Sequence, residues 1–304
     1  METQDLSLLK AFATSHAERV TAFMREKLDE LPEDAPGLCE SMKYALLLGG
    51  KRARPVLVYA AGALYGVSES ALDYAAAAVE CIHSYSLIHD DMPEMDNDTL
   101  RRGHPTVHVK FGQAGALLSG DSLQALAFQF LSDPRSGLSD AAVARLTRVL
   151  SKAAGYNGMC GGQALDLDAE HQRLTLSQLR HLHALKTGAL IRAAVQLGAQ
   201  ASDSAAAAEL EVLDRYGADA GLAFQIWDDV LDVTGETAVL GKTAGIDALN
   251  GKNTYPALLG LDKAKAMAAE AAENAASALD ALNFADEKTA VLRQFASFCV
   301  QRDH

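Results

Sequence analysis

Two clusters of acidic residues constrain most strongly how this chain can fold. Residues 89–103 place five carboxylates within nine positions and follow them at once with Arg101 and Arg102; residues 225–232 form the second cluster. Carboxylates this close raise one another's pKa unless a cation holds them together, and Mg²⁺ prefers oxygen ligands of this kind. Guanidinium groups match phosphate oxygens. We therefore expect the fold to bring both clusters together as two walls of one metal-diphosphate site.

The rest of the chain reads as helical. Of the 304 residues 49% are hydrophobic and 6% aromatic, alanine and leucine dominate, and no segment alternates with period two, so no sheet is expected. The breaks between apolar segments are too short to divide domains, so residues 1–304 are expected to form one domain. Helical spacing and turn signals predict helices at about residues 4–30, 38–48, 55–65, 70–91, 112–131, 139–154, 156–170, 177–199, 203–234, 263–282 and 286–301.

Local signals refine several helix ends. Ser70 with Asp73, and Thr175 with Gln178, have the spacing of capping boxes. Pro93 should end the helix before it, because its ring clashes with the carbonyl four residues back. Asp96 should therefore lie beyond regular helix, although it belongs to the same cluster.

Charge and cysteine content argue against several kinds of protein. A formal net charge of −13 argues against nucleic acid or an anionic membrane as a partner. Four widely spaced cysteines, without a C-x-x-C pair, are expected to be reduced, buried thiols of a cytoplasmic protein: Cys39, Cys81, Cys160 and Cys299. We expect no signal peptide and no membrane span, since no uncharged apolar run approaches ~20 residues. Hydrolase motifs such as H-E-x-x-H and G-x-S-x-G are missing from the sequence.

Basic residues form a second set of candidates. Residues 49–54 place three cations beside two glycines ahead of a helix N-terminus, an arrangement that can bind an anion, although a solvated charged turn is the commoner structure. No Ser or Thr follows the lysine as in a P-loop. Lys186, Lys242 and Lys252, taken singly, would more often be surface lysines, and His83 could equally be a core histidine.

The acidic stripe of the later helix is harder to explain as surface. Gln225, Asp228 or Asp229, and Asp232 recur three or four residues apart on a mostly apolar helix, so they must face water, a cavity or a metal. A solvated helix end usually explains one Asp pair, but two such clusters in apolar helices make that explanation the minority one.

In combination, these residues resemble the trans-isoprenyl diphosphate synthases, most closely the bacterial farnesyl diphosphate synthases. Matching stretches run over residues 49–256, about two thirds of the chain. The family's two aspartate-rich motifs match as Asp90, Asp91 and Asp96, and as Asp228, Asp229 and Asp232. The resemblance implies an all-α, single-domain bundle of about ten or more helices around a central active-site cavity (the isoprenoid synthase fold), and a homodimer.

The resemblance also assigns a role to each matched residue. Isopentenyl diphosphate would be held by Gly50, Lys51, Arg54, His83 and Arg102. The allylic diphosphate would be gripped by Arg101, Lys186, Lys242 and Lys252. The developing cation would be steadied by Lys186, Thr187 and Gln225, which are the expected catalytic residues together with Asp90 and Asp228. The six motif aspartates would bind three Mg²⁺ ions, for which Mn²⁺ could substitute, and Asp166 would lie near the first metal cluster.

Product length depends on Tyr85, with Ser86 beside it. Tyr85 lies five residues before Asp90, ~7.5 Å farther down the helix, where a ring facing the cavity would stop a growing prenyl tail and Ser86 is too small to do so. In the resembling family an aromatic residue here goes with a fifteen-carbon limit, so farnesyl diphosphate is the expected product. The alternative places Tyr85 in ordinary core, since five residues is ~140° from the face of Asp90.

Other functions remain as alternatives. The expected reaction is head-to-tail condensation of isopentenyl diphosphate with dimethylallyl and then geranyl diphosphate, but geranyl and geranylgeranyl diphosphate synthases share nearly all these residues. A terpene cyclase needs no second diphosphate site, so Lys51, Arg54 and Arg102 count against it. A non-catalytic partner subunit of a prenyl synthase would not need both metal clusters.

Overall fold

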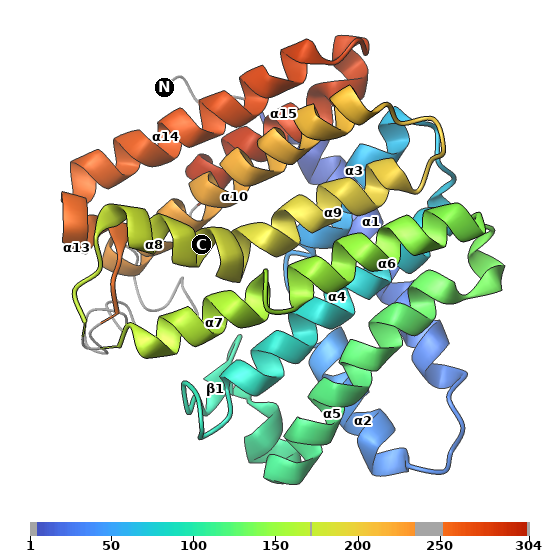
Figure 1. Ribbon diagram of the computed structural model, residues 1–304. Helices are drawn as coiled ribbons and strands as arrows, with labels where there is room; N and C mark the ends of the chain where they lie inside the picture. The colour runs from blue at the N-terminus through green and yellow to red at the C-terminus, as the bar shows by residue number, and fades with distance from the viewer. Residues whose placement is uncertain (1–4, 171, 235–251, 303–304) are drawn as a thin grey trace.

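The computed structural model of the chain describes residues 5–170, 172–234 and 252–302, which form a bundle of helices (Figure 1). The α-helices of these ranges are α1 (Ser7–Asp29), α2 (Pro36–Leu47), α3 (Ala53–Leu64), α4 (Glu69–Asp90), α5 (Val107–Ser132), α6 (Asp140–Ala154), α7 (Met159–Asp168), α8 (Leu176–His183), α9 (Ala189–Gln200), α10 (Ala207–Thr234), α13 (Tyr255–Leu259), α14 (Leu261–Ala278) and α15 (Asp286–Gln301). Shorter elements are the 3-10 turns Pro134–Ser136 and Leu279–Ala281, the π-helical turn Ala184–Gly188, and the strands β1 (Leu100–Arg101) and β2 (His104–Pro105).

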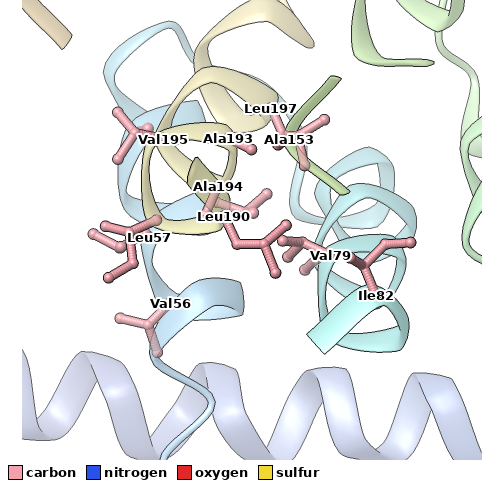
Figure 2. Packing of buried hydrophobic residues seen from close by; sticks show 14 of the residues in the cluster. Val56, Leu57, Val79, Ile82, Ala153, Leu190, Ala193, Ala194, Val195 and Leu197 are labelled. Carbon is pink, nitrogen blue, oxygen red and sulfur yellow. The ribbon is translucent and has the colours of Figure 1, made fainter. Parts of the chain in front are cut away.

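Helix α4 runs through the middle of the bundle. In Figure 1, α10, α14 and α15 lie on one side of it and α2 and α5 on the other. Buried side chains of α3, α4 and α9 interdigitate in the core, among them Leu57, Ile82 and Leu190 (Figure 2). The four consecutive alanines at 75–78 of α4 are fully buried, so this helix is apolar around most of its circumference, as a central helix must be.

Close helix contact depends on one glycine in particular. A Cβ atom at Gly198 of α9 would lie 2.2 Å from the carbonyl oxygen of Val58 in α3. Any side chain there would push the two helices apart, and close packing of the core tolerates little such movement.

The all-α prediction is confirmed, with local corrections. Helix α4 is capped by Ser68, whose hydroxyl accepts from the Ala71 amide at 3.3 Å, so the capping box predicted at Ser70 was wrong. The box at Thr175 is present. The expectation of no strands was wrong only for the two-residue β1–β2 hairpin, which follows α4 and is too short to show alternation. The helix predicted over 177–199 is interrupted by the π-helical turn.

The fold also tests the expectations about the cysteines and about membrane spans. All four cysteines are free thiols; Cys81 and Cys299 are buried, but Cys39 is half-buried and Cys160 exposed, so the prediction that all four are buried was wrong. Among the helices of the described ranges, none is long and apolar enough to cross a membrane.

Candidate active site

Residues 49–54, which span the loop after α2 and the start of α3, carry three cations: Arg52 has a structural role, and Lys51 and Arg54 border a cavity. Gly49 and Gly50 have φ of 98° and 119°, which glycine adopts readily. Arg52 turns inward, where its guanidinium forms a buried ion pair with Glu80 of α4 at 2.6 Å and donates to the Leu46 carbonyl at 2.7 Å. The loop is thereby fixed to α4.

Arg102 approaches this loop from the β1–β2 hairpin. Its guanidinium donates to the carbonyl oxygen of Gly49. A Cβ atom at Gly50 would lie 2.7 Å from the same guanidinium, so a side chain at position 50 would displace Arg102, and the φ of 119° there also favours glycine. The structure thus brings together cations that are about fifty positions apart in the sequence.

A cavity of about 710 Å³, called here the basic cavity, opens beside the loop. It is bordered by cations from several segments and by the second acidic cluster: Lys51, Arg54, Arg102, Asp228, Asp229, Asp232 and Arg302. Burial, followed by the nearby Arg302, lowers the pKa of Lys51. Burial, then Arg54, lowers the pKa of His83 well below its usual value, so His83 is neutral. A neutral imidazole can still donate one N–H to an anion.

A second cavity, of about 320 Å³, lies below Asp90 and is called here the apolar cavity. Apolar side chains of α4 and α7 make up much of its wall, and both Tyr85 and Ser86 line it. Tyr85 thus borders the cavity while it also belongs to the buried apolar core. The two cavities adjoin, since they share the lining residues Arg54, His83, Leu87 and Thr187.

The first acidic cluster separates into two kinds of carboxylate. Asp91 is 2% exposed, and both of its oxygens accept from Arg101 at 2.6–2.9 Å. Asp90 borders the apolar cavity, and its pKa is raised to about 6, mainly by burial and further by Asp96. Asp96 lies past the end of α4, as predicted, and is 3.3 Å from the Lys252 ammonium.

The three aspartates of the second acidic cluster also differ in their contacts. Asp228 pairs with Arg302 at 2.6 Å. Asp229 is buried and accepts from the Tyr255 amide and from Gln225 Nε2, both at 3.0 Å. Asp232 is 3% exposed and lines the basic cavity with the other two aspartates.

Lys186 and Thr187 are presented by the π-helical turn. A Cβ atom at Gly162 of α7 would lie 2.2 Å from the Lys186 amide nitrogen, so the turn packs directly on α7. Lys186 Nζ lies 2.5 Å from Asp166 Oδ2, and Thr187 Oγ1 donates to Gln225 Oε1 at 2.6 Å. Such π turns are frequent at functional sites, and this one orients both side chains toward the cavities.

The donors present fit Mg²⁺ that arrives with a diphosphate. Within the described ranges, no three His, Cys, Asp or Glu side chains are arranged to hold an ion by themselves. Mg²⁺ commonly takes one or two carboxylates and fills its other positions with phosphate oxygens and water. Asp90, whose buried carboxyl group is costly to ionise, would be relieved by a cation.

Sequence reasoning missed Arg302, and it assigned Lys242 to the allylic diphosphate. Arg302 follows α15 and reaches back to Asp228, with its guanidinium 3.8 Å from the centre of the Phe224 ring. Its only sequence signal is a basic residue just after a predicted helix. Lys242 lies outside the described residues.

Comparison with known proteins gives the same result as the geometry. The sequence matches the polyprenyl synthetase family over residues 35–292. It is 52% identical to farnesyl diphosphate synthase of Escherichia coli over 274 residues, covering 90% of this chain and 92% of that protein, and 46% identical to that of Haemophilus influenzae over 285 residues, covering 93% and 95%.

Solved structures share the all-α fold. An apo FPP/GFPP synthase from Zymomonas mobilis has a TM-score of 0.86 at 40% identity, covering 97% of this chain and 100% of that one. A geranyltransferase from Helicobacter pylori, complexed with magnesium and isoprenyl diphosphate, has a TM-score of 0.82 at 35% identity, covering 95% of each chain. The chain belongs to the polyprenyl synthetase family.

Proposed function

We propose that this protein is a Mg²⁺-dependent farnesyl diphosphate synthase that condenses isopentenyl diphosphate with dimethylallyl and then geranyl diphosphate. The observation that carries the proposal is the junction of the two cavities. A basic cavity suited to diphosphates adjoins an apolar cavity suited to a prenyl tail, with Arg54, His83 and Thr187 among the residues that border both. The names of the Escherichia coli and Haemophilus influenzae relatives support the same product.

The basic loop would hold isopentenyl diphosphate. Lys51, Arg54 and Arg102 border the basic cavity, and the Gly50 backbone lies beside them. Neutral His83 would add a hydrogen bond without adding charge. Because Arg52 is already paired with Glu80, it would act by positioning the loop.

The allylic diphosphate would be bound between the acidic clusters. Three Mg²⁺ ions, or Mn²⁺ as a substitute, would be held by the motif aspartates and would neutralise the diphosphate as a leaving group. Arg101, fixed by Asp91, would contact the same diphosphate, as would Lys186 and Lys252. Lys242 is proposed for this role from its sequence position alone.

The chain's own residues would then support three bond changes. The allylic C–O bond breaks, the isopentenyl double bond attacks the resulting carbocation, and a proton is lost to the departed diphosphate. Thr187 and Gln225, held together by their 2.6 Å hydrogen bond, would direct oxygen lone pairs toward the positive charge. The apolar wall would exclude water, which would otherwise capture the cation. No covalent nucleophile is needed.

Three broader features belong to the same proposal. Residues 1–304 would form one polyprenyl synthase domain that acts in the cytoplasm as a homodimer. The dimer is supported by α5, where Leu117 and Leu118 are 48% and 54% exposed although both are large and apolar.

The purified chain, incubated alone with Mg²⁺, isopentenyl diphosphate and dimethylallyl diphosphate, tests the proposal. After dephosphorylation, chromatography should give farnesol as the main product. Geraniol or geranylgeraniol as the end product would keep the chemistry but overturn the chain length. Complete lack of turnover at saturating Mg²⁺ would indicate a non-catalytic partner subunit, and a cyclic hydrocarbon would indicate a terpene cyclase.

A further inference from the structure

We propose that Cys160 of α7 lines, together with Tyr85, the part of the apolar cavity that the end of the prenyl chain reaches, and that the volume of the Cys160 side chain sets product length. The inference rests on the proposed function. It goes beyond the assignment of Tyr85 because it places a second limiting side chain, a thiol, on another helix.

The two helices that line the apolar cavity present their side chains in the same order. Figure 1 shows α4 and α7 running in the same direction, and residues of both border the cavity. Tyr85 precedes Asp90 by five residues and Cys160 precedes Asp166 by six, which correspond to ~7.5 Å and ~9 Å of helix. On each helix the carboxylate, Asp90 or Asp166, therefore lies toward the C-terminal end, and Tyr85 or Cys160 lies toward the N-terminal end.

A direct contact joins these two side chains. The Tyr85 hydroxyl lies 3.4 Å from Cys160 Sγ, within hydrogen-bonding distance for sulfur. Burial raises the pKa of Tyr85, so its hydroxyl stays protonated and can donate to the thiol. The contact links α4 to α7 across the end of the cavity.

The Tyr85 ring is held in place from behind. It packs edge-on against His89, with 5.8 Å between ring centroids. His89 Nε2 lies 3.2 Å from the Leu117 carbonyl oxygen, and a Cβ atom at Gly120 would collide with the same imidazole. Because α5 supports His89 and His89 supports the ring, Tyr85 has little freedom to move aside for a longer product.

An unpartnered polar group indicates that this space holds a ligand. Gln163 lines the same cavity and is 8% exposed, yet neither its amide nitrogen nor its amide oxygen has a hydrogen-bond partner. Such a group is rare in ordinary core packing. Gln163 lies one turn beyond Cys160 on α7, so a prenyl chain that reached Cys160 would pass beside this amide.

Graded enlargement of the thiol tests the proposal on the intact enzyme. Alkyl methanethiosulfonates of increasing length are used: the thiolate attacks the sulfenyl sulfur, a mixed disulfide forms and methanesulfinate leaves. Mass spectrometry of peptides measures labelling of Cys160. We expect the product to shift from farnesyl to geranyl diphosphate as the attached group grows from methyl to butyl, and dithiothreitol to restore farnesyl diphosphate.

Two variants complete the experiment. Cys160→Ser keeps a hydroxyl for Tyr85 but lacks the thiol, so its product ratio should be the same before and after the reagent; this controls for reaction at Cys39, Cys81 or Cys299. Cys160→Leu should shift the product toward geranyl diphosphate without any reagent. If labelling of Cys160 is incomplete, the product of Cys160→Leu still tests whether the side-chain volume at position 160 sets product length.

The outcomes separate the inference from the function on which it rests. Fully labelled enzyme, or Cys160→Leu, that still makes mainly farnesyl diphosphate would overturn the role of Cys160 and leave the proposed function intact. Failure of the unmodified enzyme to make any prenyl diphosphate would overturn both.

Discussion

Neighbouring aspartates of one motif have different electrostatic environments. Burial raises the pKa of both carboxyl groups, but Asp91 is paired with Arg101, which partly offsets that effect. Asp90 borders the apolar cavity, and its pKa is raised to about 6. Asp91 therefore positions a guanidinium, while the charged form of Asp90 would be stabilised by a cation. Both residues belong to the same motif, but their contacts differ.

This difference predicts that stabilisation by Mg²⁺ depends on pH. Because the pKa of Asp90 is raised, its proton is bound below about pH 6, and Mg²⁺ must displace it. With inorganic diphosphate present, the rise in Tm on adding Mg²⁺ should be large at pH 7.5 and fall as pH decreases through 6. Differential scanning calorimetry, with EDTA as the metal-free reference, measures this rise in Tm. The Asp90→Asn variant should show a weaker dependence of the rise on pH. An equal rise in Tm at pH 5 and pH 7.5 in the parent protein would contradict the prediction.

A second prediction at this scale concerns Tyr85. Tyr85→Ala should remove the ring at the end of the apolar cavity and let products of twenty carbons or more accumulate. The large-to-small change should also lower the free energy of unfolding, by about 3–5 kcal/mol if the space stays empty and by less when product fills it. Chromatography of dephosphorylated products measures chain length. Tyr85→Phe, which keeps the ring, is the matched control and should not yield the twenty-carbon product.

At the scale of elements, the basic loop depends on α4 for its position. Arg52 and Glu80 have side chains 2% and 3% exposed, so their ion pair is removed from water. Removing one partner of a buried pair leaves an uncompensated charge. The geometry of the loop, and with it that of Lys51 and Arg54, is therefore coupled to the stability of α4.

Glu80→Ala should consequently lower the free energy of unfolding by about 3–5 kcal/mol. Urea denaturation followed by circular dichroism measures the change. The matched control is the ion pair of Lys43 and Asp29, whose side chains are 34% and 59% exposed. Asp29→Ala should cost about 0–1 kcal/mol, and a similar cost for both substitutions would mean that the buried pair does not fix the loop.

The loop's own contribution to binding can be separated from its stability. Arg54→Ala should chiefly raise KM for isopentenyl diphosphate, by about 10- to 100-fold, since a hydrogen bond to a charged group contributes ~1.5–3 kcal/mol. KM for the allylic substrate should change much less. Arg148→Ala, on an exposed position of α6, should alter neither. An equal rise for both substrates would show that the basic residues have been divided wrongly.

At the scale of the whole molecule, the features that could be predicted are those defined by residues close together in the sequence. Helical spacing marked most helices, and the two acidic clusters marked segments whose aspartates line the two adjoining cavities. Contacts between distant segments could not be predicted this way: Arg302 reaches Asp228 from the end of α15, and Cys160 meets Tyr85 across a cavity. Such pairs form because the helices pack together, and the spacing of residues within either segment does not reveal which distant segment it will contact.

The outer face of α5 carries a prediction about assembly. Ala114, Leu118 and Ala125 are exposed and follow one another at spacings of four and seven residues, which places them on one side of the helix, with exposed Leu117 beside them. Figure 1 shows α5 at the edge of the bundle, so this side is available to a second copy. A two-fold interface uses each residue twice, and burial of one leucine contributes ~1.5–3 kcal/mol.

We therefore expect the parent chain to sediment as a dimer, and the double variant Leu117→Glu with Leu118→Glu to sediment as a monomer at the same concentration. Its far-ultraviolet circular dichroism should remain helical, since both side chains point outward. Leu8→Glu on α1, where the leucine is 43% exposed, is the matched control and should stay dimeric. The α5 backbone supports His89, and through it the Tyr85 ring, so the monomer should also release a larger fraction of products longer than fifteen carbons. A dimeric double variant would place the interface on another face of the bundle.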